Sequence, residues 1–252
     1  ANTKAIVPVH VSGRAAPLPE LLQIARRHAV RIIEDAAEAL GSRAFGAPLG
    51  SHGDMGCFSF TANKTITSGQ GGMVITKDPG LHQRLRELKD QGRPVRGTGG
   101  ADEHVSIGFN FKFTDLQAAM GLAQLESLPA RWQTLRQLAA WYRAGLPEDE
   151  RVHLGPYDLE AGECPQWVDG LFEQRDGLHH ALLEEGIETR KFWYALHTQA
   201  PYLHDGSALT NSTEVSSKGL WLPSAFSLTE SDVARVCDSV KAWLERTSRV
   251  LS

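Results

Sequence analysis

The stretch 57-CFSFTANKTITSGQGGMVIT-76 determines how the first half of the chain folds. Its two apolar ends, residues 57–60 and 72–76, predict short β-strands. Between them lies a polar loop of threonine, asparagine, serine and glycine around one lysine, Lys64. Small residues let a backbone approach a ligand closely. The loop therefore predicts a binding platform built around a single amine.

Outward from this loop, strand-like and helix-like segments alternate. A near-continuous apolar run predicts a buried strand, and leucines at helical spacing predict a helix. The expected strands are 4–11 and 30–35, the expected helices are 17–29 and 78–92, and residues 36–42 are expected to form a short helix or a turn. Alternation of this kind predicts an α/β fold with a mainly parallel sheet.

The second half predicts a smaller α+β unit. A glycine-rich loop at 93–108 precedes a helix at 114–128 that Thr114 is placed to cap, and a further helix runs from Pro129 to about Gly145. Turn-forming residues fill 148–166, and beyond them we expect a helix at 174–187, a strand at 187–196 and a helix at 227–247. We place the domain boundary in the helix before residue 148. The expected division is a large domain, 1–140, and a small domain, 141–252.

Composition narrows the class of protein. The 252 residues carry a net charge of −4, which argues against nucleic acid as a partner. No apolar run approaches the roughly 18 residues that cross a bilayer, and the first residues lack a signal-peptide pattern. The cysteines Cys57, Cys164 and Cys237 lack metal-site spacing, so we expect buried free thiols and no metal. A cytoplasmic protein that does not bind a membrane is expected.

Two charged residues are candidates for chemistry. Asp35 ends an apolar strand, and ligands of open α/β sheets bind at the carboxyl ends of strands; the alternative is an aspartate that caps the next helix. Lys64 in its small-residue loop could lose its proton through burial and attack a carbonyl to form a Schiff base. The alternative for Lys64 is a solvated surface charge.

Two polar residues extend this set. Ser59 ends the strand before the lysine loop, where its hydroxyl could hold a phosphate oxygen. Asn110 precedes a capped helix, and helix N-termini favour anions; the alternative for Asn110 is an ordinary helix-entry turn.

Together these residues resemble the nucleotide-sugar aminotransferases of the DegT/StrS group, fold type I enzymes that use pyridoxal 5'-phosphate. The resemblance covers the whole chain, and it is carried by AIVPVH (5–10), IIEDAAEALGS (32–42), GDMGCFSFTANKTITSGQGGMVIT (53–76), GFNFKFTDLQAAMGLAQLE (108–126) and GIETRKFWYALHTQAPY (186–202). The fold that it implies is a mainly parallel large domain followed by a small α+β domain.

The resemblance also implies a role for each site residue. Lys64 matches the lysine that binds the cofactor aldehyde and later moves protons, and Asp35 matches the aspartate that pairs with the pyridine nitrogen. Glu38 matches a position close to the cofactor ring. Ser59 matches a phosphate ligand, and Asn110 matches an asparagine that reaches the cofactor phosphate of the neighbouring subunit. A homodimer with a shared active site follows from this match.

The implied reaction moves an amino group from glutamate to a keto group of a nucleotide-linked sugar. The amino-acid sequences of two motifs are similar to those of perosamine-synthase-like enzymes, which aminate C4 of a GDP-linked 4-keto-6-deoxy sugar. Three residues are weaker candidates for the substrate pocket: Arg190, His197 and Tyr202. For the nearby Trp193 and Tyr194 we expect a place in the core of the small domain.

The chain also departs from the family pattern. Lys112 stands where arginine is usual, Ser12 where an aromatic is usual and Ala195 where proline is common. Family members carry a segment before the strand that AIVPVH matches, which supplies early strands, a phosphate loop and an aromatic that stacks on the ring. A chain without that segment would expose apolar surface and open sheet edges, so we expect poor stability on its own.

Two other functions remain open at this point. One is a degenerate, non-catalytic homologue or fragment that binds a sugar nucleotide or a partner chain. The other is a different carbonyl-handling enzyme on the same fold, because fold does not fix function. Neither the identity of the sugar and nucleotide nor the sugar carbon that is aminated follows from the sequence.

Overall fold

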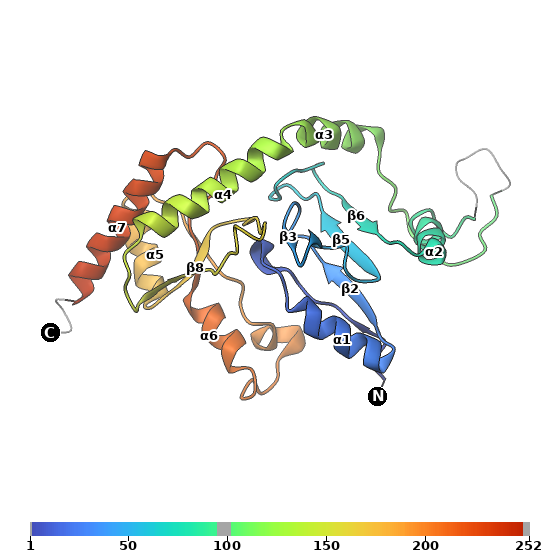
Figure 1. The fold of residues 1–252 in the computed structure, drawn as a ribbon, viewed down its shortest axis with the longest axis horizontal. Coiled ribbons are helices and arrows are strands. Elements are labelled where there is room, and N and C mark those ends of the chain that lie inside the picture. Colours follow the sequence, from blue (N-terminus) through green and yellow to red (C-terminus); the bar gives the residue numbers. More distant parts are fainter. Residues whose placement is uncertain (1, 95–101, 249–252) are drawn as a thin grey trace. The chain divides into compact units, whose positions relative to one another are not determined.

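The computed structural model describes residues 2–94 and 102–248, which form two compact units (Figure 1). The first contains Ala1–Ala130 and the returning loop Asp158–Gln166, and the second contains Arg131–Tyr157 and Trp167–Ser252. The division therefore falls within one helix, α4 (Leu128–Gly145). The expected domain boundary at residues 140/141 lies in the same helix and remains a prediction.

A four-stranded sheet forms the centre of the first unit. Its strands are β1 (Ala5–Ile6), β2 (Arg31–Asp35), β5 (Met55–Ser59) and β6 (Gly72–Ile75), in the order β1-β2-β5-β6. The pairs β1–β2 and β2–β5 are parallel, and β5–β6 is antiparallel. The predicted α/β fold with a mainly parallel sheet is confirmed.

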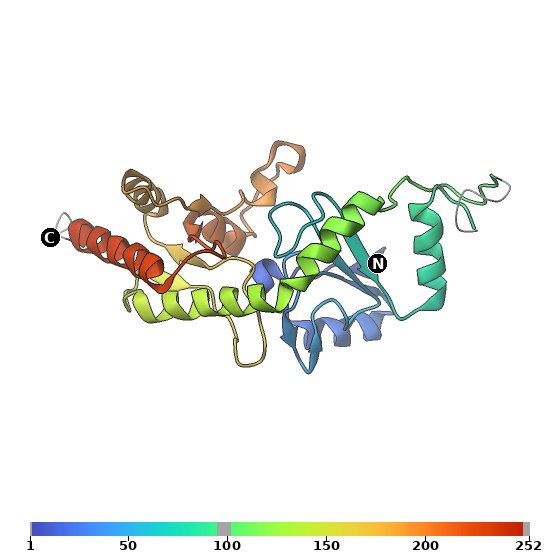
Figure 2. The same cartoon turned by 90° about the horizontal axis from the view of Figure 1, so that it is seen from above.

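Helices complete the first unit. Helix α1 (Leu18–His28) lies along one face of the sheet and contacts β1 and β2 (Figure 2). Helix α2 (Pro79–Lys89) begins at Asp78, and α3 (Asp115–Glu126) begins at Thr114 with a capping box completed by Gln117. The start predicted at Thr114 is therefore confirmed.

The core of the first unit lies between α1 and the segment after β2. Leu18 is fully buried and packs in a cluster with Ala36, Ala39, Ala44 and Leu49, against which Leu22 and Phe58 also pack. Leu18 is thus the position where α1 is fixed to the rest of the unit.

One strand expected in the first unit is much shorter than predicted. The strand expected at 4–11 is only two residues long, because Pro8 has no N–H to donate; pairing returns at the single bridge between Val9 and Asp35. Residues 36–42 form turns, one of the two forms expected for this segment. They lead into a hairpin that was not predicted, β3 (Arg43–Ala44) and β4 (Ala47–Pro48). Positive φ angles at Phe45 and Gly46 allow this tight turn.

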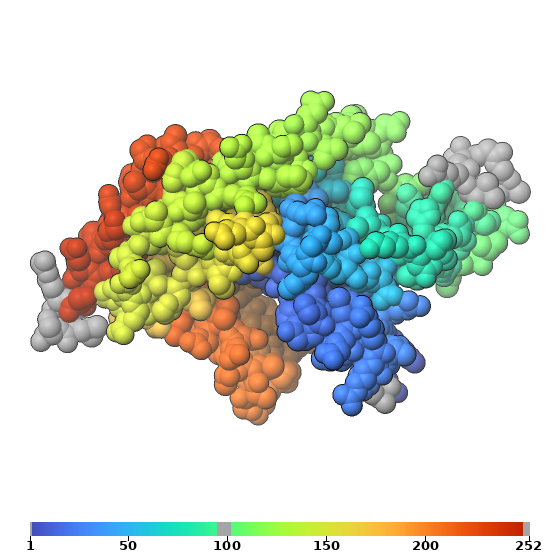
Figure 3. Space-filling view, viewed as in Figure 1, coloured from blue at the N-terminus to red at the C-terminus, as the bar shows by residue number. Residues whose placement is uncertain are grey.

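Apolar side chains remain exposed on the first unit. All four residues of the edge strand β6 are exposed, and no residue of α3 is buried. Helix α3 lies on the outside of its unit (Figures 1 and 3), where Leu116 is 83% exposed and Leu122 is 64% exposed. A helix that is apolar all round is normally covered, so this surface has the character of an interface.

The second unit is built on an antiparallel sheet. Its strands are β7 (Val152–Leu154), β8 (Asp169–Phe172), β10 (Gly219–Trp221) and β9 (Arg190–Lys191), in that order. Its helices are α5 (Arg175–Glu184), α6 (Thr210–Lys218) and α7 (Glu230–Ser248). Helix α7 turns Val233, Val236, Val240 and Leu244 into the core, and α5 packs against it.

Several details of the second unit differ from the prediction. Helix α6 and strands β7, β8 and β10 were not predicted, and the strand expected at 187–196 shrinks to Arg190–Lys191. Trp193 and Tyr194 are not core residues, since they are 46% and 78% exposed. Trp193 packs edge-on against Trp221 of β10, with ring centroids 4.4 Å apart.

We expect Leu18→Ala to destabilise the first unit by about 3 kcal/mol, because it leaves a cavity in a tightly packed cluster. Ile24→Ala is the matched control on the same helix: Ile24 is 47% exposed, and its loss should cost less than about 1 kcal/mol. Urea unfolding at neutral pH measures both. Equal losses in the two variants would contradict the placement of the core.

Candidate active site

Asp35 lies where the carboxyl ends of β2 and β5 meet. These strands are parallel and place Asp35 opposite Cys57. The Asp35 backbone is held from both sides, since its N–H donates to Pro8 O at 2.9 Å and its carbonyl accepts from His10 N at 3.0 Å. Its Oδ1 accepts from Ala37 N at 3.1 Å, which caps a turn, not a helix. The half-buried carboxylate is therefore fixed at the ligand-binding edge expected for such a sheet.

Lys64 is held in the loop between β5 and β6. Ser68 N donates to Phe60 O at 3.0 Å, which closes the loop, and Thr65 Oγ1 donates to Gln166 Oε1 at 3.1 Å, which anchors it. The side chain of Lys64 is only 12% exposed and its Nζ lies 3.4 Å from Glu38 Oε1. The surface-charge alternative for Lys64 is therefore wrong.

Glu38 connects Lys64 to the segment after β1. Its Oε1 faces the lysine, and its Oε2 accepts from the backbone N–H of Ser12 at 2.9 Å. Ser12 is buried, adopts a left-handed conformation with φ of 53°, and its Oγ has no hydrogen-bond partner within the described residues. A buried hydroxyl without a partner is a group that a bound ligand could satisfy.

Ser59 ends β5, next in sequence to the lysine loop. It pairs with Gly72 across β5–β6, and its Oγ lies 3.2 Å from Thr61 Oγ1. The half-buried Ser59 and Thr61 thus place two hydroxyls on the segment that leads to Lys64. The structure therefore groups Asp35, Glu38, Ser59 and Lys64 around the ends of two neighbouring strands.

Asn110 lies elsewhere on the first unit. It is exposed and forms an isolated antiparallel bridge with Asp90, at the end of α2. Within residues 2–94 and 102–248 it makes no hydrogen bond to Asp35, Glu38, Ser59 or Lys64. Lys112, on the same segment, donates to Asp90 Oδ1 at 2.5 Å and helps lower the pKa of that carboxyl. The role of Asn110 toward a neighbouring subunit remains a prediction.

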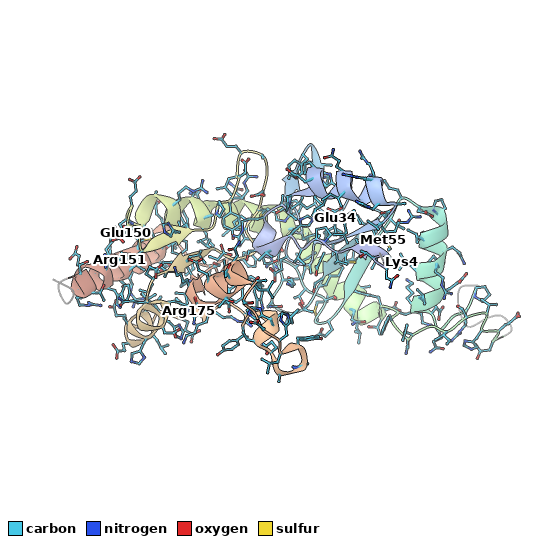
Figure 4. The ribbon with its side chains drawn as sticks, turned by 90° about the horizontal axis from the view of Figure 1, so that it is seen from below. Lys4, Glu34, Met55, Glu150, Arg151 and Arg175 are labelled. Atoms are coloured by element: carbon cyan, nitrogen blue, oxygen red, sulfur yellow. The ribbon has the colours of Figure 1, made fainter. Side chains whose placement is uncertain are left out.

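The buried carboxylate of Glu34, labelled in Figure 4, was not singled out from the sequence, yet its hydrogen bonds tie His10 and the loop 50–53 to β2. Its Oε2 accepts from His10 Nε2 at 3.0 Å and from Gly50 N at 2.7 Å, and its Oε1 accepts from His52 N and Gly53 N, each at 2.7 Å. An acid inside the apolar run RIIED was the available signal, because buried charges need partners.

The state of the Glu34–His10 pair follows from its hydrogen bonds. His10 Nδ1 accepts from Ala16 N at 3.1 Å, so Nε2 carries the proton that is donated to Glu34. Burial by itself would raise the pKa of Glu34, but the bonds from His10 and from the Gly53, Gly50 and His52 N–H groups together lower it. Glu34 is therefore an ionised carboxylate at neutral pH.

Close backbone packing surrounds Glu34. A Cβ on Gly56 of β5 would lie 1.9 Å from the carbonyl oxygen of Gly50, which is too close for any side chain. The loop whose N–H groups bind Glu34 therefore lies directly against β5, and two glycines make this approach possible.

The weaker substrate-pocket candidates all lie in the second unit. His197 is buried, and its Nε2 lies 3.2 Å from Thr213 Oγ1 at an open hollow of about 740 Å³. Arg190 is exposed and stacks on Trp221 at 5.3 Å, and Tyr202 is 60% exposed. The hollow groups His197 with His204, Thr213 and Glu214, but neither Arg190 nor Tyr202 lines it.

The three cysteine thiols, all within the described ranges, are not placed for catalysis or metal binding. Cys164 and Cys237 are buried, and Cys57 is only half-buried. Burial and then the charge of Asp35 raise the pKa of the Cys57 thiol, which keeps it protonated and a poor nucleophile. Among the described residues, no group of three histidine, cysteine or acidic side chains could hold a metal ion. In the same ranges no helix has the length and apolar character to cross a membrane.

Sequence comparison identifies an aminotransferase family, which agrees with a lysine and an aspartate at the carboxyl edge of an α/β sheet. The chain belongs to the DegT/DnrJ/EryC1/StrS aminotransferase family, whose profile matches residues 1–241.

Named relatives and solved structures give the likeness in detail. GDP-perosamine synthase of Caulobacter vibrioides is 37% identical over 245 residues, which cover 93% of this chain and 64% of that protein. GDP-perosamine synthase of Vibrio cholerae is 35% identical over 253 residues, which cover 96% of this chain and 67% of that protein. DesI, crystallised in the presence of its TDP-sugar product, superposes with a TM-score of 0.85 at 31% identity and covers 99% of this chain and 66% of DesI. The chain thus spans about two thirds of the length of these relatives.

We expect Glu34→Gln to lower the free energy of unfolding by about 3 kcal/mol at pH 7, because an amide NH₂ would face N–H donors in a buried site. Since folding lowers the pKa of Glu34 below its ordinary value of 4.5, its contribution is complete above that pH and is lost as pH falls through the folded pKa. The variant should therefore lose less stability than the native chain on acidification.

Urea titrations between neutral and acidic pH measure both effects. Glu20→Gln, on the exposed face of α1, is the control and should follow the native curve. A Glu34→Gln curve parallel to the native one would contradict the role given to Glu34.

Proposed function

We propose that this protein is a pyridoxal phosphate-dependent aminotransferase that moves an amino group from glutamate to a keto group of a nucleotide-linked sugar. The observation that carries the proposal is the half-buried Lys64 amine, held beside Glu38 at the sheet edge where Asp35 ends β2. Membership of an aminotransferase family supports it. The role would lie in the biosynthesis of a cell-surface polysaccharide or of a sugar in secondary metabolism.

The residues present fit pyridoxal phosphate by the chemistry of their donor set. The Lys64 amine suits an aldehyde, the Asp35 carboxylate suits a protonated ring nitrogen, and the Ser59 hydroxyl suits a phosphate oxygen. Ser12, whose backbone N–H donates to Glu38, adds a buried hydroxyl that has no hydrogen-bond partner among the described residues. When bound, the cofactor supplies an electron sink for the charge left when a substrate loses its α-proton.

Each residue then has a defined task. Asp35 keeps a proton on the ring nitrogen, because a fixed negative charge favours the protonated form of its partner. Lys64 Nζ would bind the cofactor aldehyde and would take the α-proton from the substrate. Glu38 lies against the lysine and keeps a charged partner beside it. Ser59 orients the phosphate.

The named relatives support a nucleotide-linked sugar as the substrate. Two of those most similar to the chain are GDP-perosamine synthases, and another is a UDP-N-acetyl-3-dehydro-α-D-glucosamine 3-aminotransferase from Acidithiobacillus ferrooxidans at 32% identity. We therefore favour a GDP-linked 4-keto-6-deoxy sugar as the amino acceptor. His197, with Arg190 and Tyr202 as weaker candidates, is proposed to contact the sugar nucleotide.

Addition of pyridoxal phosphate should produce a visible absorbance band that depends on Lys64, because the amine joins the cofactor aldehyde. Lys64→Ala should lack the band, and reduction with borohydride followed by peptide mass spectrometry should locate the label on Lys64. Glutamate should then bleach the band as the amino group moves to the cofactor. A non-catalytic homologue would give neither the band nor the bleaching, and that result would refute the proposed function.

We propose that the functional form is a homodimer in which the exposed apolar surface of α3 is buried. Leu122→Lys should shift the assembly toward monomer, because a charge on a buried apolar interface is costly. Leu183→Lys is the control, since Leu183 is 51% exposed on α5 of the second unit. Sedimentation velocity at micromolar concentration measures the state, and a native chain that sediments as a monomer would exclude the dimer.

A further inference from the structure

The carboxylate of Glu38 has one donor for each oxygen. Its Oε2 accepts the backbone N–H of Ser12 at 2.9 Å, and its Oε1 lies 3.4 Å from Lys64 Nζ. The two side chains of the ion pair are 13% and 12% exposed, so water screens their attraction less than it would on the surface. The carboxylate thus bridges a fixed backbone donor and a long, flexible amine.

The backbone donor belongs to a rigid turn. Ser12 is buried with φ of 53°, its carbonyl accepts from Gln166 N at 2.9 Å, and Gly13 N donates to His10 O at 3.2 Å. His10 is in turn held by Glu34. The Ser12 N–H therefore has little freedom to move, and it fixes the carboxylate end of Glu38.

We propose that Glu38 is a positioning residue for Lys64: anchored on the Ser12 N–H, its carboxylate holds the lysine amine at the carboxyl ends of β2 and β5, ready to react with a bound aldehyde. The inference rests on the proposed function. A free lysine side chain populates many rotamers, and fixing it costs entropy. An amine that is already held has met that cost before the aldehyde arrives.

The reaction that this position serves is covalent capture. A carbon–nitrogen double bond forms between Lys64 Nζ and the aldehyde carbon, the aldehyde oxygen leaves as water, and the extra proton of the ammonium passes to solvent. Glu38 forms no bond in this step. Glu38 acts only by fixing the position of Lys64 Nζ. Removing the Glu38 carboxylate should therefore change the rate at which the amine meets the aldehyde.

Glutamine at residue 38 separates this role from packing. It fills the same volume and its one oxygen can keep the Ser12 N–H, but its NH₂ then faces the lysine, and a charged amine has only donors. Glu38→Gln therefore loses the contact to Lys64 and keeps the contact to Ser12. Glu38→Asp keeps two oxygens on a shorter side chain that cannot span both donors.

The first measurement is the rate at which the visible band grows after mixing the chain with pyridoxal phosphate. Glu38→Gln and Glu38→Asp should slow this rate about threefold to tenfold, as expected for the loss of one charge-assisted contact. Glu87→Ala is the matched control, because it removes an ion pair of the same length, Arg84 Nη1 to Glu87 Oε2 at 3.4 Å, from helix α2. This control should capture the cofactor at the native rate.

The second measurement does not involve the cofactor. Trace acetic anhydride labels lysines, and peptide mass spectrometry gives the labelling of Lys64 relative to Lys112 in the same sample. Glu38→Gln should increase this ratio, because an amine released from the ion pair is easier for a small reagent to reach. The two rates should therefore move in opposite directions. A change in the charge of the amine alone would move both rates in the same direction, because both reactions use the same nucleophile.

The outcomes are distinct. Slower capture with faster labelling supports the proposal, and capture at the native rate in both Glu38 variants overturns it while leaving the proposed function intact. Rates that fall or rise together also overturn it. If the native chain captures no pyridoxal phosphate, the proposed function fails together with this inference, whatever the Glu38 variants do.

Discussion

The rest of the first unit depends on the hydrogen bonds that the buried carboxylate of Glu34 accepts. Four donors meet it: the His10 imidazole and the N–H groups of Gly50, His52 and Gly53. They come from two segments that are distant in sequence, and one of these, residues 8–10, also brackets the backbone of Asp35. A buried charge that is satisfied four times is costly to rearrange. The segments that it joins therefore form a stiff support for the adjacent Asp35.

At the carboxyl ends of β2 and β5, the carboxylate that stabilises the structure is a different one from the carboxylates that could contact a ligand. Glu34 faces inward and carries the structural charge, whereas its neighbour Asp35 and the nearby Glu38 keep carboxylates that are only half-buried. Such carboxylates can still exchange partners with a ligand, because part of their solvation remains. Lys64 combines the same two features, since its loop is closed by backbone bonds and its amine forms an ion pair with the Glu38 side chain. The backbone is thus fixed while the reacting groups stay adjustable.

Much of this could be predicted from the sequence, for identifiable reasons. Asp35 and Ser59 each end an apolar run, and parallel strands bring their carboxyl ends together, so their grouping with Lys64 follows from strand order. The helix start at Thr114 was readable because capping is local chemistry. Contacts between distant residues were not readable: nothing in RIIED names His10 as the partner of Glu34. The strand expected at 4–11 was made too long, because the apolar run was followed past Pro8, which has no N–H to donate.

The errors in the second unit have the same origin. Trp193 and Tyr194 look like core residues by composition, but their burial depends on which face of a very short strand is covered. Strand β10 lies directly after α6, and no turn signal separates the two. Strand pairing depends on partners far along the chain, whereas the start of a helix is encoded within four residues. The antiparallel unit was therefore less predictable than the parallel one.

The approach of Gly50 to Gly56 has a consequence for how sequences of this kind can diverge. Because a Cβ on Gly56 has no room, any side chain there must push away the loop that binds Glu34. A change at Gly56 would therefore be felt at Asp35 without altering any group that handles substrate. In a set of homologues, we expect this glycine to vary as little as Lys64, the lysine proposed to react, although its only task is to be small. Invariance of residues 50–56 would thus reflect close packing. A search for reactive groups that used invariance alone would select residues that do no chemistry.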